Sequence, residues 1–89
     1  MFAKFKDGRM TEKRLGRFEL SRSLLFEFQE DALLIMRDLL VCRCEDSFAT
    51  DTTKYIAFSK HFDIVPENAI VPEYDVRVTD NKEVIWSKV

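Results

Sequence analysis

Glycine and proline are scarce in this chain of 89 residues, which contains two of each. Flexible linkers are rich in these residues, so their scarcity argues against long linkers. Long apolar runs are also missing: the longest, residues 32–36, falls far short of the roughly 20 residues that a membrane-spanning helix needs. The first residues lack the run of about seven or more apolar residues that a secretory signal requires. We therefore expect neither a membrane span nor export.

Cysteine and histidine are also rare, with two and one in the chain. Cys42 and Cys44 lie two positions apart on one strand, so they are too close and too parallel to form a stapling disulfide. This favours a reduced, cytoplasmic compartment. Zinc binding by the two thiols and His61 would lack the spaced pairs typical of structural sites. Cysteines on an apolar strand face are normally protonated and unreactive, so we predict strand packing rather than a metal site or a catalytic thiol.

No motif for catalysis or cofactor binding is present. The two glycines form no phosphate-cradling pattern, and both the Walker and the dinucleotide fingerprints are missing. Adjacent carboxylates occur at 30–31 and at 45–46, but neighbouring side chains on a helix or strand point apart. Neither pair is therefore poised for acid–base work. We predict a protein that is not an enzyme and that uses no cofactor.

What the chain does contain is 46% hydrophobic and 34% charged residues, the composition of a folded protein. The length leaves room for one core, so we predict a single domain over residues 1–89. Residues 1–23 carry seven basic and three acidic side chains, a net charge of +4. The remaining residues carry seven basic and thirteen acidic ones, a net charge of −6. We interpret residues 1–16 as a flexible or loosely attached basic arm on an acidic body.

Two conformations are open for this arm. Asp7-Gly8 favours a tight hairpin turn, which would pair residues 2–6 with residues 9–12. Alternatively, Thr11 caps one helical turn at residues 12–15.

One helix is predicted over residues 24–39, because apolar residues recur there at steps of three and four. Its start is open between a cap at Ser23 and a later beginning near Gln29. Alternating or apolar runs predict strands at residues 17–20, 39–45, 54–60, 73–79 and 83–89. The last two should form a hairpin with a three-residue loop, which places Val78 opposite Val84 and Val76 opposite Trp86.

The predicted fold class is thus α+β, with one main helix packed on an antiparallel sheet of four to five strands that ends in a C-terminal β-hairpin. The expected buried face consists of apolar residues and the two thiols: Leu40, Cys42, Cys44, Ile56, Phe58, Val76 and Val78 from the sheet, with Leu25, Phe28, Ile35, Met36 and Leu39 from the helix. Other apolar residues would remain on the second face: Val41, Tyr55, Ala57, Val84 and Trp86. A homodimer formed through the sheet or its terminal strand would cover them.

One segment has a family resemblance. The stretch Phe58-Ser59-Lys60-His61-Phe62-Asp63-Ile64-Val65-Pro66-Glu67, continued to Pro72-Glu73-Tyr74, resembles a segment of small bacteriophage-encoded proteins of unknown function. In those proteins a strand ends in Ser-x-x-Phe and is followed by Val-Pro-Glu and a second proline. The match covers about a fifth of the chain and carries no functional residue over. The resemblance implies a viral accessory protein that binds, and often inhibits, a host protein.

Three functional hypotheses follow. The leading one is a small protein-interaction module, a phage or prokaryotic accessory protein that binds a host protein or a second copy of itself through Tyr55, Glu73, Asp75, Val84 and Trp86. The alternative is nucleic-acid binding through the cations of the basic arm, which are Lys4, Lys6, Arg9, Lys13, Arg14 and Arg17, interleaved with phenylalanines. The third is a small-ligand or catalytic site around His61.

Overall fold

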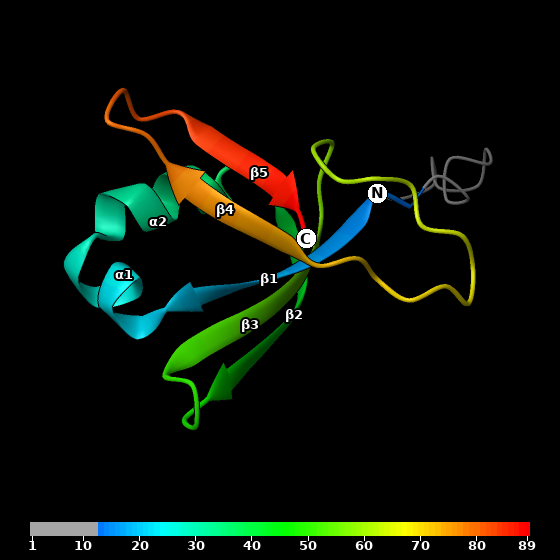
Figure 1. Cartoon of the computed structure of the whole chain (residues 1–89), viewed down its shortest axis with the longest axis horizontal. Coiled ribbons are helices and arrows are strands. Elements are labelled where there is room, and N and C mark those ends of the chain that lie inside the picture. The colour runs from blue at the N-terminus through cyan, green and yellow to red at the C-terminus, as the bar shows by residue number, and fades with distance from the viewer. Residues whose placement is uncertain (1–12) are drawn as a thin grey trace.

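The computed structural model describes residues 13–89 (Figure 1). It contains five strands and two short helices: β1 (Leu15–Ser21), α1 (Arg22–Glu27), α2 (Gln29–Met36), β2 (Leu40–Ser47), β3 (Thr52–Phe58), β4 (Tyr74–Val78) and β5 (Val84–Lys88). The α+β class is confirmed. None of the helices in residues 13–89 is long and apolar enough to cross a membrane.

The start of the described chain belongs to the sheet. The predicted hairpin of residues 2–6 and 9–12 lies outside the described residues. The alternative, a helical turn at residues 12–15, is wrong for its last two residues. Arg14 forms a β-bridge with Ile64, and β1 begins at Leu15. Residues 14–16, which we assigned to the arm, are therefore part of the folded body.

The strands form two antiparallel sheets rather than the single predicted sheet. One has the order β1-β3-β2 and the other is the β4–β5 hairpin. Figure 1 shows β1 between β3 and the hairpin. The sheets meet where the Arg17 amide donates to the Pro72 carbonyl at 2.9 Å and Arg17 bridges Glu73 in parallel. Pro72 has no N–H to donate, so the ladder does not extend before this bridge, and after it β4 pairs with β5 rather than with β1.

The single predicted helix is two helices that meet at Phe28. Its backbone leaves the helical region with φ −125° and ψ 53°, so α1 ends there and α2 begins at Gln29. The first cap is Ser21, two residues before Ser23, and its hydroxyl accepts from the Leu24 amide at 3.1 Å. The break leaves Phe28 56% exposed instead of buried, while Ile35 of α2 reaches the core.

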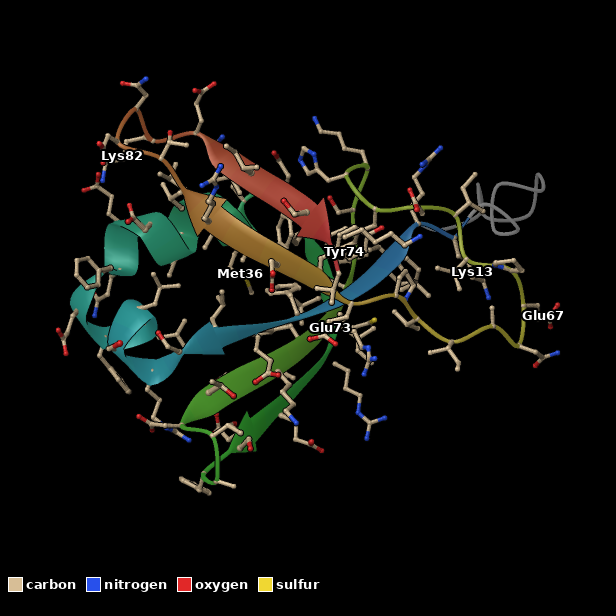
Figure 2. All side chains as sticks on the ribbon, in the orientation of Figure 1. Lys13, Met36, Glu67, Glu73, Tyr74 and Lys82 are labelled. Atoms are coloured by element: carbon tan, nitrogen blue, oxygen red, sulfur yellow. The ribbon has the colours of Figure 1, made fainter. Side chains whose placement is uncertain are left out.

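The core lies between the inner face of the three-stranded sheet, the helices and the hairpin. Its buried members are Phe18, Leu20, Ile35, Ala57, Phe62 and Tyr74, and the partly buried residues that pack on them are Leu24, Leu25, Met36, Leu39, Tyr55, Val76, Val78, Val84 and Trp86. Figure 2 shows Met36 beside the hairpin and Tyr74 at the start of β4, whereas Lys82 and Lys13 lie toward opposite ends of the molecule. The predicted buried positions in the hairpin and in the second half of the helix are thus confirmed.

The predicted orientation of β3 is wrong. Tyr55 and Ala57 face the core, where they pair with Phe18 and Gly16 of β1, and Ala57 is fully buried. Ile56 and Phe58 therefore lie on the outer face, because successive side chains alternate. Both faces of this strand are apolar in sequence, so periodicity could not decide between them; the pairing with β1 decides it.

The orientation predicted for β2 is also wrong. Leu40 is 66% exposed, and both cysteines are exposed free thiols. The register with β3 shifts between Val41 and Arg43, so Cys42 is the extra residue of a β-bulge. β2 is the last strand of the sheet, beyond the residues that form the core, and its side chains remain in solvent on both faces.

The C-terminal hairpin is confirmed in register. Val76 lies opposite Trp86 and Val78 opposite Val84, as predicted. The amide of Thr79 donates to the Glu83 carbonyl at 2.9 Å, which closes a three-residue loop. Lys82 has φ 65°, the left-handed conformation that a loop of this length uses before the second strand.

Candidate protein-binding edge

The edge of β2 that faces away from β3, called here the free edge, is exposed among residues 13–89. β2 pairs with β3 along one side only, and no other described strand lies against its second side. Seven of its eight residues are exposed, and Ser47 is half-buried. Such a strand presents a row of unpaired N–H and C=O groups to solvent. These groups can pair with a strand from another protein.

Natural proteins protect such edges with charged side chains, lysine above all, with prolines or with bulges. β2 carries the charged residues Arg43, Glu45 and Asp46 but no proline and no lysine, and its bulge lies at its beginning, where the Cys42 thiol donates to the Ile56 carbonyl at 3.2 Å. From Arg43 to Ser47 the register with β3 is regular. Five consecutive residues therefore offer an undistorted edge.

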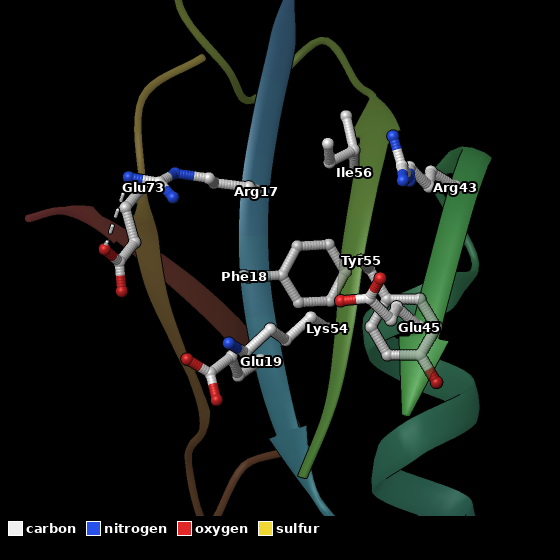
Figure 3. A pocket seen from close by; sticks show the side chains of 9 residues that line it. All are labelled: Arg17, Phe18, Glu19, Arg43, Glu45, Lys54, Tyr55, Ile56 and Glu73. Carbon is white, nitrogen blue, oxygen red and sulfur yellow. Dashed lines mark ion pairs between the residues drawn. The ribbon is translucent and has the colours of Figure 1, made fainter. Parts of the chain in front are cut away.

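The outer face next to this edge carries alternating charges around a shallow hollow of about 240 Å³. Figure 3 shows the side chains that line it: Arg17, Phe18, Glu19, Arg43, Glu45, Lys54, Tyr55, Ile56 and Glu73. Lys54 lies opposite Glu19 on one side and opposite Glu45 on the other. Arg17 and Glu73 form an ion pair at 3.8 Å across the border with β4. Opposite charges therefore meet at each step of the row Glu19–Lys54–Glu45, whereas in the neighbouring row Ile56 separates Arg17 from Arg43.

The inner face of β2 lies at the margin of the core. Cys44 lies opposite Tyr55, and Asp46 opposite Thr53, whose hydroxyl donates to the Asp46 carboxylate at 2.9 Å. Partial burial, together with the nearby Cys44 and Asp46, raises the pKa of the Tyr55 phenol above 10.0. Tyr55 is therefore neutral at physiological pH, and its ring stacks on that of Phe18 with the centroids 5.2 Å apart.

The residues predicted to form a protein-binding surface do not come together in one. Trp86, Tyr55 and Val84 pack on the core, so they do not form the expected surplus of exposed apolar side chains. Glu73 and Asp75 are exposed at the beginning of β4. Arg43 and Glu45 were not among the predicted site residues. Their alternate, charged positions in the run Leu40–Ser47 could have indicated a solvent-exposed face of a strand that we assigned to the core.

The cations of the arm are only partly described. Lys4, Lys6 and Arg9 lie outside the described residues. Lys13 is exposed, the Arg14 guanidinium donates to the Phe62 carbonyl at 3.1 Å, and Arg17 pairs with Glu73. Arg14 also lines a shallow hollow at the end of the sheet, together with Arg37, Asp38, Leu39, Leu40, Phe58, Ser59 and Lys60. Three cations are thus gathered beside one aromatic ring.

His61 lies beside the carboxylate of Asp38. Its Nε2 atom lies 3.5 Å from Oδ2 of Asp38, and both side chains are partly exposed. The His61 amide donates to the Ser59 hydroxyl at 3.1 Å, which fixes the turn after β3. Within residues 13–89, no group of three or more histidine, cysteine or acidic side chains is arranged to hold a metal ion.

Comparisons with known proteins add no family. No protein-family model matches the chain, and the comparisons with curated proteins and with solved structures gave no match either. The resemblance of residues 58–74 to small bacteriophage proteins therefore stays a prediction.

Proposed function

We propose that this chain is a non-enzymatic protein-interaction module that binds another protein by adding a strand to the free edge of β2. The observation that carries the proposal is the accessibility of this edge along the whole strand, on both faces and on the side away from β3. In strand addition, main-chain hydrogen bonds provide affinity and alternate side chains provide specificity. Both components are present at β2.

The charges of β2 determine which charges a partner strand should carry. Arg43 and Glu45 lie on one face, two positions apart, with Ile56 and Lys54 of β3 beside them. An antiparallel partner strand would place an acidic residue opposite Arg43 and a basic residue opposite Glu45. Like charges directly opposite each other are destabilising, so a strand with the reversed order should be rejected.

Two proline variants test the proposal. Successive N–H groups of a strand point to opposite edges, so one of Cys44→Pro and Glu45→Pro removes an N–H toward β3 and the other removes an N–H toward solvent. Circular dichroism and thermal unfolding identify the variant that keeps the fold. The matched alanine variant at the same position retains the N–H and serves as its control.

The readout is capture by the tagged full chain from a nuclease-treated lysate of a plausible host. We expect a stoichiometric protein that the alanine variant retains and the folded proline variant loses. Equal capture by both variants would show that the edge of β2 is not the binding surface.

A second candidate function, nucleic-acid binding, rests on the cations beside Phe58. Arg14, Arg37 and Lys60 line the same hollow as this half-buried ring, which combines phosphate contacts with a stacking surface. The triple alanine variant of these cations should lose most of its affinity for a single-stranded oligonucleotide. It should also make the slope of log K against log salt concentration shallower, by the equivalent of about three phosphate contacts. Affinity that does not change with salt concentration contradicts this candidate.

A further inference from the structure

We propose that the occupant of the β2 edge is the β2 strand of a second copy, in an antiparallel pair whose two-fold axis passes through Cys44. This inference rests on the proposed function and names its partner. A pair of β2 strands would extend the three-stranded sheet into a six-stranded one across the dimer. The argument for a second copy is the charge complementarity of the strand with itself.

Symmetry limits the possible registers. The two-fold axis that relates adjacent antiparallel edge strands is perpendicular to the sheet, so both copies keep the same face on the same side. In such an interface, residue i meets j and residue j meets i. Because side chains alternate between faces, two residues can lie opposite each other only if they share a face in one copy. The axis must therefore lie midway between the two copies of one residue, which is then opposite itself.

Charge then selects the residue. An axis at Arg43, Glu45 or Asp46 places that charged side chain directly against its own copy, which is unfavourable. An axis at Cys42 uses the bulge residue, where the ladder is already disrupted. An axis at Leu40 or Val41 lies before the bulge, and one at Ser47 pairs only that residue within β2. The axis at Cys44 remains, and it pairs residues 43–45 of the two strands; Val41 and Ser47 stay unpaired, because the bulge puts them on opposite faces.

This register is complementary on the outer face. Arg43 lies opposite Glu45 of the second copy, and the symmetry repeats this pair. The row across the existing sheet already alternates in sign from Glu19 to Lys54 to Glu45. Arg43 of the second copy would lie next to Glu45 in this row, so the charges would continue to alternate across the interface.

The inner face brings the two exposed thiols of Cys44 opposite each other, whereas Cys42 lies at the bulge, outside the regular pairs. Directly opposite Cβ atoms in an antiparallel pair are about 4.5–5.5 Å apart, close enough for a disulfide after a small adjustment. In this register a disulfide between the two copies would therefore form through Cys44 and not through Cys42.

The first experiment is a charge swap measured by sedimentation equilibrium of the full chain under reducing conditions. Arg43→Glu and Glu45→Arg each place like charges in both symmetric pairs, and we expect each to raise the dissociation constant of the dimer by about tenfold or more. The double variant R43E/E45R restores both pairs across the interface and should dimerise much more tightly than either single variant, although it places a cation opposite Lys54 within each copy. Single variants that dimerise like the natural chain overturn the register.

The second experiment is mild oxidation of the same dimer with diamide. Two Cys44 thiols lose two protons and two electrons to diamide, which becomes the hydrazine, and the S–S bond forms between the copies. A covalent dimer should form with the natural chain and with Cys42→Ser, but not with Cys44→Ser. Cross-linking that survives Cys44→Ser overturns the axis at Cys44.

The proline test separates this inference from the proposed function. If the chain is monomeric at all concentrations and the folded proline variant loses a captured protein, the second copy is ruled out while strand addition stands. If the chain is monomeric and the proline variant captures what its alanine control captures, both proposals fail.

Discussion

The indole of Trp86 meets the ring of Phe18 edge to face, with the ring centroids 5.1 Å apart. A second edge-to-face contact joins the same indole to Phe62 at 5.0 Å. Since Trp86 belongs to β5 and Phe18 to β1, these contacts join the hairpin to the three-stranded sheet. Trp86 is thus a structural residue that joins the hairpin to the core.

Replacing Trp86 by alanine should consequently lower the free energy of unfolding. We expect a loss of about 2–4 kcal/mol, somewhat below the range for a fully buried aromatic residue because the indole is half-buried. Urea unfolding followed by circular dichroism measures it, and Trp86→Phe should lose clearly less. A variant that loses partner binding at unchanged stability would argue for a direct role in recognition.

Gly16 is required by the aromatic rings that pack over β1. A Cβ atom added at this position would lie 2.8 Å from two atoms of the Phe62 ring and 2.8 Å from Cδ1 of Tyr74. Both rings belong to the buried cluster and cannot move freely. Gly16→Ala should therefore destabilise the fold by about 1–3 kcal/mol, measured by urea unfolding. Lys54→Ala on the outer face is the control, and an equal loss in the two variants would contradict this explanation.

The hydroxyl of Tyr74 accepts a hydrogen bond from the Asp63 amide at 2.8 Å. This bond attaches the segment after β3 to the beginning of β4. Tyr74→Phe removes it and keeps the ring, which packs against Phe62 at 4.6 Å. We expect a loss of about 0.5–1.5 kcal/mol and faster hydrogen exchange at the Asp63 amide. Unchanged exchange would show that the bond does not hold this segment.

The carboxyl of Asp63 is predicted to titrate below its ordinary pKa of 3.8. The cause is the hydrogen bond from the Lys88 ammonium, at 2.8 Å, and the attraction of its charge. A lowered pKa in the folded state means that the pair stabilises the fold above the ordinary pKa. This contribution is lost as the pH falls through the lowered value. Carboxyl-detected NMR titration measures the pKa, and Lys88→Ala should raise it toward 3.8. A pKa that does not respond to this substitution would contradict the pairing.

The parts of the fold that follow from local patterns could be predicted from the sequence. The register of the terminal hairpin is one example, because the loop length and the facing valines and tryptophan select one pairing. The existence of each strand is another. The second half of the helix was predicted for the same reason, since its apolar spacing matches one face.

The parts that depend on distant residues could not be predicted. Ile56 and Tyr55 are equally suited to a core, and only the pairing of Tyr55 with Phe18 places one inside. The bulge at Cys42 arises from the pairing with β3 and has no local signature. The candidate site was missed for the same reason, because the exposure of β2 depends on how far the other elements extend over the sheet.

The position of β1 in the chain has a consequence for biosynthesis. Each of the other strands pairs with a neighbour in sequence, β2 with β3 and β4 with β5, and local pairs of this kind close quickly. β1 instead needs β3, whose partner residues run from Thr52 to Phe58, and then Pro72. During translation β1 therefore leaves the ribosome long before any of its partners. Phe18 and Leu20, two of the most buried residues of the finished protein, remain in water until more than half of the chain has been made.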